Sequence, residues 1–196
     1  MKKALVINAH QKYEGWAEGK LNQLFSQVAI DTLSTLHYDI KTTTVDEGYD
    51  ANEEVEKHLW ADIVIVQTPL YWMGSPWLFK KYIDEVFNAG LGDKLAADDG
   101  RTRSDPSKTY GSGGLTTGKK LLVSVTLNAP ENAFNQKEFF EGHNIDQLFM
   151  WLHKAYQFNG FESVDGFATY DIFKNPTIEE DVKRYEDHLI TTFQYA

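Results

Sequence analysis

Short apolar runs recur along the chain at intervals that predict the strands of a buried sheet. Ala4–Ile7 and Ile63–Val66 are continuous apolar runs, and Leu121–Leu127 is mostly apolar and partly β-branched. Runs of this kind are typical of strands that are covered on both faces of a parallel sheet. Asp39–Val45, with its threonines, predicts a weaker edge strand, and Ser163–Tyr170 is a candidate fifth strand.

Helical patterns lie between these strands. Apolar residues recur at spacings of three and four over residues 21–32. Ser75-Pro76 predicts an N-cap followed by proline at the first helical position, which opens a helix over Trp77–Asn88. Asp146–Phe158 is strongly apolar, and Pro176–Phe193 carries acidic residues in its first turns, where the helix dipole favours negative charge.

The alternation of strands and helices predicts an α/β fold with a parallel sheet. Five strands favour the flavodoxin-like order 2-1-3-4-5, a three-layer sandwich with helices on both faces of the sheet. A six-stranded dinucleotide-binding fold is less favoured, because the sequence has no G-x-G-x-x-G motif. No repeat, low-complexity segment or linker interrupts the chain, so we expect residues 1–196 to form a single domain.

Composition narrows the classes of partner. A formal net charge of −10 argues against a nucleic-acid partner, and the absence of cysteine excludes disulfides and thiolate chemistry. The six histidines show no metal-ligand spacing, so we expect no metal site. The apolar run near the N-terminus is too short for a signal peptide, and no segment approaches membrane-spanning length. We therefore expect a cytoplasmic protein without membrane insertion.

The glycine-rich stretch Gly113–Lys120 fits most of a nucleotide-binding P-loop pattern. Lys120, however, stands where Ser or Thr would hold magnesium. The glycines also precede a predicted strand, whereas a P-loop follows a strand and opens a helix. We interpret the stretch as part of a long irregular segment, Gly90–Lys120, with a use other than phosphate binding.

The predicted strand order places a ligand site beyond the carboxyl ends of the strands, where the order reverses. The loops His10–Lys20, Leu70–Ser75 and Asn128–Asn135 should meet there. Tyr71 and Trp72 follow a buried strand directly, and large aromatic side chains at such a position suit a flat ring. The alternative is that they pack under the long segment or at a subunit contact.

Four features of the sequence carry a family resemblance. They are Asn8 after the first strand, LWADIVIVQTPLYWMGSPWLFKKYIDEVF (59–87), DGRTRSDPSKTYGSGGLTTGKK (99–120) and TLNAPENAF (126–134). Together they resemble the modulator of drug activity B family of NAD(P)H:quinone oxidoreductases, which is related to the DT-diaphorases. The resemblance implies a flavodoxin-like fold, tightly bound FAD, NADPH or NADH as hydride donor, a quinone substrate and a homodimer.

Carried over position by position, the resemblance implies a set of FAD contacts. For the pyrophosphate these are Ala17, Glu18, Gly19, Lys20, Leu21, Asn22, Gln23 and Leu24, and for the isoalloxazine Leu70, Tyr71, Trp72 and Met73. Tyr110 in the long segment and Thr126, Leu127, Asn128 and Ala129 complete the set. Tyr110 is also the candidate catalytic residue, which would orient quinone, and His143 falls near the place of a quinone-pocket histidine in DT-diaphorases. The first loop departs from the family pattern, with Ala17 where Ser is expected.

The residues themselves favour FAD over FMN. The segment 10–20 contains no Ser or Thr, so a terminal phosphate would lack hydroxyl donors, whereas a pyrophosphate can use the N–H groups of a helix N-terminus and Lys20. Flavin chemistry at one site shared by both substrates implies ping-pong turnover. Arg101, Arg103 and Lys108 are candidates for binding the NADPH phosphates. The alternative is that they belong to a solvated loop or form salt bridges across a dimer contact.

Two other functions stay open at this point. One is an electron carrier of the flavodoxin type, which would bind FMN and lack a nucleotide pocket. The other is a non-enzymatic dimeric binding module whose aromatic residues contact a partner.

Overall fold

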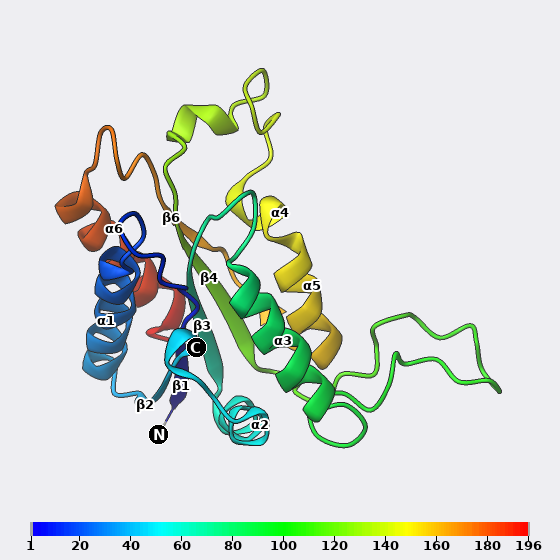
Figure 1. The fold of residues 1–196 in the computed structure, drawn as a ribbon. Coiled ribbons are helices and arrows are strands. Elements are labelled where there is room, and N and C mark those ends of the chain that lie inside the picture. The colour runs from blue at the N-terminus through cyan, green and yellow to red at the C-terminus, as the bar shows by residue number, and fades with distance from the viewer. Residues whose placement is uncertain (1, 196) are drawn as a thin grey trace.

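A computed structural model describes residues 2–195 as a parallel sheet with helices on both faces (Figure 1). The strands are β1 (Lys3–Asn8), β2 (Asp39–Thr44), β3 (Ile63–Pro69), β4 (Lys120–Thr126), β5 (Glu162–Ser163) and β6 (Phe167–Thr169). Their order is β2-β1-β3-β4-β5, and β6 pairs with the carboxyl half of β4. This order confirms the flavodoxin-like prediction.

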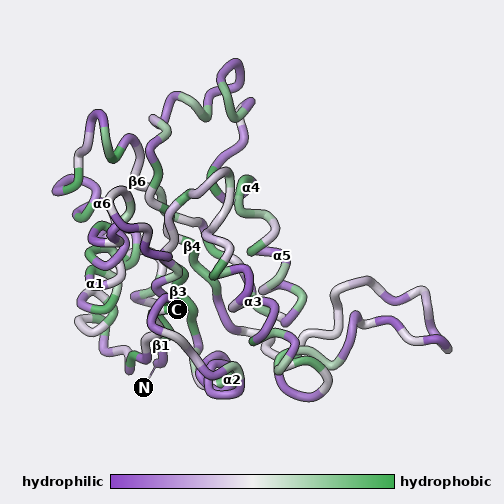
Figure 2. Tube along the Cα trace, viewed as in Figure 1, coloured by the Kyte–Doolittle hydropathy of each residue, from purple (hydrophilic) through white to green (hydrophobic). Residues whose placement is uncertain are grey.

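The helices form two layers that enclose the sheet. They are α1 (Lys20–Thr35), α2 (Ala51–Trp60), α3 (Trp77–Ala89), α4 (Ile145–Leu148), α5 (Met150–Asn159) and α6 (Ile178–Phe193), with 3-10 turns η1 (Val45–Glu47) and η2 (Glu131–Phe134). α1 and α6 pack on one face of the sheet, and the other helices pack on the opposite face. Figure 2 shows apolar residues gathered along the strands and the helix sides that contact them.

Two predicted elements are each divided in the structure. The predicted helix Asp146–Phe158 is broken at Phe149, whose φ of −94° and ψ of 19° separate α4 from α5. The predicted strand Ser163–Tyr170 becomes β5 and β6. Between them Gly166 approaches α4 so closely that an added Cβ would lie 2.3 Å from Asp146 Oδ1. Packing against α4 therefore interrupts this strand.

Two helix starts differ from the prediction. Helix α2 was not predicted, although Asp50 caps it by accepting hydrogen bonds from the backbone N–H groups of Asn52 and Glu53. An N-cap acid with Glu three residues later is a recognisable start signal. At α3 the expected Ser75 cap is wrong, because Pro76 occupies the N-cap position and the Ser75 hydroxyl accepts from Thr68 Oγ1 instead.

The segment 90–119 between α3 and β4 contains no regular helix or strand, and the structure describes all of it. Residues 99–111, here called the arm, extend away from the body of the protein (Figure 1). The arm is closed at its base by a hydrogen bond of 2.7 Å from Gly111 N to Asp99 O. Near this base Gly114 packs on the backbone of α5, where an added Cβ would lie 2.3 Å from Gly160 N.

Lys119, the lysine of the P-loop-like stretch, has a structural partner. Its Nζ donates hydrogen bonds to the carbonyl oxygens of Leu59 and Ala61 at the carboxyl end of α2. A cation at this end of a helix satisfies carbonyl groups that have no partner within the helix. In this stretch Gly113 and Gly114 thus serve close packing, and Lys119 serves helix capping.

Candidate functional site

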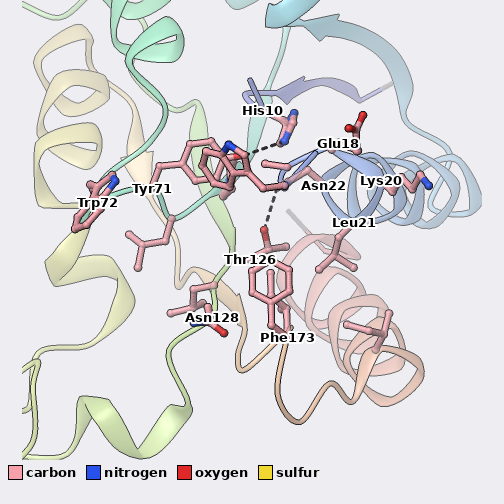
Figure 3. A pocket seen from close by; sticks show the side chains of 18 residues that line it. His10, Glu18, Lys20, Leu21, Asn22, Tyr71, Trp72, Thr126, Asn128 and Phe173 are labelled. Carbon is pink, nitrogen blue, oxygen red and sulfur yellow. Dashed lines mark hydrogen bonds between the residues drawn. The ribbon is translucent and has the colours of Figure 1, made fainter. Parts of the chain in front are cut away.

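A cavity of about 660 Å³ opens at the carboxyl ends of β1, β3 and β4, as the strand order predicts (Figure 3). Many of the expected contact residues line it: Ala17, Glu18, Gly19, Lys20, Leu21, Asn22, Leu70, Tyr71, Trp72, Thr126, Leu127 and Asn128. Gln23, Leu24, Met73, Tyr110 and Ala129 do not line it. The fold therefore brings three predicted loops together at one edge of the sheet.

The amino end of α1 forms one wall of the cavity. Gly19 occupies the N-cap position with a φ of 82°, and the first helical hydrogen bond runs from Gln23 N to Gly19 O. The backbone N–H groups of Lys20, Leu21 and Asn22 therefore have no helical acceptor. Donors of this kind, with the helix dipole behind them, bind anions.

The first loop folds back on itself as a small hairpin beside this helix end. Tyr13 and Ala17 exchange backbone hydrogen bonds of 3.0 and 2.9 Å. The Trp16 ring stacks on Tyr13 at 4.9 Å and contacts the Tyr71 ring at 5.3 Å. This aromatic cluster joins the loop after β1 to the loop after β3.

His10 strengthens the same junction. Its Nε2 lies 3.0 Å from the Tyr71 hydroxyl (Figure 3), and this hydroxyl donates a hydrogen bond to Gln11 O at 3.3 Å. Burial lowers the pKa of His10 below its ordinary value and raises the pKa of Tyr71 to about 12. Both side chains are therefore uncharged near neutral pH, and His10 is a pocket residue that the sequence reasoning missed.

The loop after β3 ends in a strained turn at the mouth of the cavity. Tyr71 and Gly74 exchange backbone hydrogen bonds of 2.8 and 3.1 Å, and the two central residues, Trp72 and Met73, have φ values of 45° and 67°. Such a turn usually carries Asn-Gly. The Trp72 side chain is 95% exposed. Backbone strain of this kind is concentrated at functional sites in proteins.

The far end of the cavity is apolar and comes from a segment that no motif indicated. Ile172 and Phe173, in the loop after β6, and Ile178, at the start of α6, line the cavity together with Leu21. The Phe173 side chain is largely exposed. The cavity thus continues past the amino end of α1 to a second apolar region.

The arm lies at the other end of the sheet, because it leads into the amino end of β4. Tyr110 contacts the Phe158 ring at 5.8 Å, and the Arg101 guanidinium lies 5.2 Å from the centre of the Tyr110 ring. Arg101 also forms a 2.6 Å ion pair with Asp99. Tyr110, Arg101, Arg103 and Lys108 are therefore remote from the cavity of their own chain.

His143 lies near a second, smaller cavity. It belongs to the excursion after η2 and lines, with Phe139 and Met150, a hollow of about 390 Å³. Among residues 2–195, no group of three His, Asp or Glu side chains is arranged to hold a metal ion. The helices of the same described range are also too short or too polar to cross a membrane.

Comparison with known proteins adds the following similarities. The profile of a family described as having a flavodoxin-like fold matches residues 2–189. An uncharacterised protein of Schizosaccharomyces pombe is 44% identical over 99% of this chain and 98% of its own length. The NADPH:quinone oxidoreductase MdaB of Haemophilus influenzae is 43% identical over 91% of this chain and 93% of its own length. These matches confirm the resemblance found in the sequence.

Two more distant proteins are also similar to this chain, one in structure and one in sequence. The crystal structure of a Klebsiella pneumoniae protein assigned as a quinone reductase superposes with a TM-score of 0.80, at 20% identity, over 99% of this chain and 86% of that one. An FMN-dependent NADH:quinone oxidoreductase of Thiobacillus denitrificans is 30% identical over 60% of this chain and 48% of its own length.

Proposed function

We propose that this chain, which belongs to the family with the flavodoxin-like fold, is an NAD(P)H:quinone oxidoreductase that works through a bound flavin. One observation carries the proposal, namely the large cavity where an anion-binding helix end and an aromatic rim meet. The helix end suits the phosphate-bearing chain of a flavin, and the aromatic rim suits its flat ring. The full-length similarity to the Haemophilus influenzae oxidoreductase supports the same activity.

FAD is the flavin that we propose, although a similar protein is named as FMN-dependent. The first loop offers no hydroxyl donors for a terminal phosphate. The cavity also extends beyond the helix end to Leu21, Ile172 and Ile178, which form an apolar region suited to a second ring system. FMN has no second ring system, so it would leave this apolar region empty.

The residues of the chain have distinct roles in this proposal. The N–H groups at the start of α1 would bind the phosphates, and the loop of Leu70, Tyr71 and Trp72, which lines the cavity, would contact the flavin ring. A flavin held here would supply the redox chemistry: it would accept hydride from the nicotinamide and pass it to quinone, which would also take up one proton from solvent to become the hydroquinone. Because both substrates would use the one open mouth in turn, we propose ping-pong kinetics.

The homodimer and Tyr110 remain part of the proposal. Tyr110 is remote from its own cavity, so it can orient quinone at a flavin only if a second copy brings its arm to the mouth of the site. Large apolar side chains are exposed at the cavity (Trp72), at the starts of α3 and α5 (Trp77 and Met150) and in the loop after η2 (Phe139). A second copy would cover them. Residues 1–196 would act as one domain of this dimer.

Identification of the released flavin tests the proposal. Purified protein should be yellow and should release one FAD per chain on acid extraction, as chromatography would show. NADPH should bleach the bound flavin without oxygen, and added quinone should restore the colour. Release of FMN would refute the choice of flavin, and colourless protein would refute the function.

A further inference from the structure

We propose that Gln67 is a positioning residue, which orients the Asn22 amide so that its Nδ2 hydrogens face the cavity and bind oxygen atoms of the ribityl-phosphate chain of the flavin. Gln67 lies in β3, beneath the cavity, and is not one of its lining residues. The inference rests on the proposed function, because it concerns the same flavin.

Two hydrogen bonds define the orientation of Asn22. Its Oδ1 accepts one from Gln67 Nε2 at 3.0 Å and one from Thr126 Oγ1 at 3.3 Å (Figure 3 shows the second). A carbonyl oxygen has two lone pairs, so both are used on the side of the sheet. The Nδ2 group, with its two donors, is left for the cavity that Asn22 lines.

The Gln67–Asn22 pair has a second hydrogen-bonded arrangement, in which both amides are turned. Asn22 Nδ2 would then donate to Gln67 Oε1, and Asn22 Oδ1 would face the cavity as an acceptor. The structure has the arrangement that presents donors. Phosphate and ribityl oxygens accept hydrogen bonds, so the donors presented in this arrangement can bind them. In the turned arrangement Asn22 Oδ1 would face these oxygens, and no hydrogen bond could form between two acceptors.

Because Gln67 and Asn22 are both buried, the orientation of their amide groups affects the free energy of the site. Gln67 is 0% exposed and Asn22 is 4% exposed, so water cannot easily replace a lost bond between them. Gln67 Oε1 has no hydrogen-bond partner in the described residues, and burying an unpaired oxygen destabilises the folded state. Gln67 directly follows the apolar run Ile63–Val66, where another apolar residue would continue the pattern. An apolar side chain there would avoid this cost. We therefore attribute the glutamine to the site rather than to the stability of the sheet.

The donors of Asn22 add to those of the helix end. Asn22 is the third residue of α1, so its side chain lies beside the free N–H groups of the first turn. Backbone and side-chain donors from one turn thus converge on one part of the cavity. A ligand with consecutive oxygen atoms fits this set better than an apolar ligand does.

Binding of FAD to flavin-free protein tests the role of Gln67. Gln67→Leu keeps the size of the side chain but removes the donor, and it should weaken FAD binding about tenfold in a fluorescence-quenching titration. In an Asn22→Leu background the same change should have no further effect, because no amide is left to orient. Thr126→Val, which removes the second donor to Asn22, should weaken binding by a smaller factor of about three.

Thr169→Val is the matched control. Thr169 is fully buried, its hydroxyl also lacks a partner among the described residues, and no hydrogen bond joins it to Asn22. FAD affinity of this variant should stay within about twofold of the parent. The thermal midpoint of each flavin-free variant shows whether it is folded, and Gln67→Met replaces Gln67→Leu if the latter is not.

The outcomes separate the inference from the proposed function. If the unaltered protein binds no flavin, the proposed function fails. If it binds FAD but the Gln67 variant binds equally well, the positioning role alone is refuted. Full additivity of the Gln67 and Asn22 changes would also refute it, because the two residues would then act independently.

Discussion

The first loop, residues 10–19, and the arm, residues 99–111, are both irregular segments with aromatic and charged side chains, yet the fold uses them differently. In the first loop the Trp16 ring packs on the Tyr71 ring, and His10 Nε2 lies within hydrogen-bond distance of the Tyr71 hydroxyl. The first loop therefore forms a wall of the cavity in its own chain. In the arm Tyr110 is 67% exposed and contacts Phe158, far from that cavity. One segment completes a site within the chain, and the other is directed outward.

The difference follows from the edge of the sheet at which each segment begins or ends. The first loop leaves the carboxyl end of β1, where ligands bind in parallel sheets. The arm leads into the amino end of β4, at the opposite edge. A long loop with aromatic and charged side chains can therefore bind a ligand in its own chain only when it leaves the carboxyl ends of the strands. The arm requires a second molecule for any role at the cavity.

The largest expected effect comes from a change in the first loop. Gly19 has a φ of +82°, and an added Cβ would lie 2.7 Å from His10 Nδ1. Gly19→Val places a β-branched residue in a left-handed backbone conformation and also creates a steric clash. Together these effects should lower the free energy of unfolding by about 4 kcal/mol. We expect nearly complete loss of bound FAD, measured by absorbance of the purified protein.

Gly15→Val is the matched control for this change. Gly15 also has a φ of +82°, but nothing lies within 4 Å of the added Cβ. It should cost only the backbone strain, about 1–2 kcal/mol, and should retain flavin. Equal loss of flavin in both variants would show that the His10 contact is unimportant.

Acidification should affect the body of the protein more than the arm. Burial lowers the pKa of His58 to about 4, from an ordinary value of 6.5. Between these values the unfolded chain binds a proton that the folded chain does not, so stability is present above pH 6.5 and is lost as the pH falls toward 4. The loss should be about 3 kcal/mol.

Urea unfolding at several pH values measures this loss. A His58→Gln variant should show a flatter profile between pH 6.5 and pH 4, whatever its stability at neutral pH. An unchanged slope would assign the acid sensitivity to other groups.

Replacement of the arm tests its outward role. With Gly100–Tyr110 replaced by two glycines, the thermal midpoint of the flavin-free protein should change by no more than about 2 °C, because the arm packs little on its own chain. Quinone turnover should fall about a hundredfold if the arm completes the site of a second copy. Light scattering should show whether the dimer persists.

Mixing two inactive variants then decides whether the arm acts on its own chain. Dimers that combine a Gly19→Val chain with an arm-replaced chain contain one intact cavity facing one intact arm, if the arm reaches across. Refolding the two together should restore activity. No recovery, despite mixed dimers, would contradict the proposal for Tyr110.

Within the arm, Arg103 and Arg101 should differ. Arg101 is paired with Asp99 and lies over Tyr110, so Arg101→Ala should disturb the arm and affect both nucleotides alike. Arg103→Ala should raise KM for NADPH about tenfold relative to NADH, if it binds the extra phosphate. Arg103→Lys should have an intermediate effect. Equal changes with both nucleotides would reject the phosphate role.

Trp72→Ala should have the smallest effect on stability. Because the side chain is 95% exposed, the free energy of unfolding should change by less than about 1 kcal/mol, as urea titration would measure. Flavin retention should nevertheless decrease, since the indole stands at the rim of the cavity. Unchanged retention in this folded variant would show that Trp72 does not contact the flavin.

The sequence by itself determined the central strands of the sheet and the position of the cavity. The runs at Ala4–Ile7, Ile63–Val66 and Leu121–Leu127 became the central strands, because strands covered on both faces require continuous apolar residues. Once their order is known, the edge of ligand binding follows. Helix α2 was missed although Asp50 and Glu53 carry a start signal, because its apolar positions are few.

Tertiary structure alone decided which distant segments meet. Ile172 and Phe173 reach the far end of the cavity because β6 runs beside β4, and no local pattern in that loop indicates a site. The outward path of the arm, the break at Phe149 and the Gln67–Asn22 contact likewise depend on the packing of neighbouring elements. Local periodicity reports which side of an element is buried, but the partner that buries it is set by the path of the whole chain.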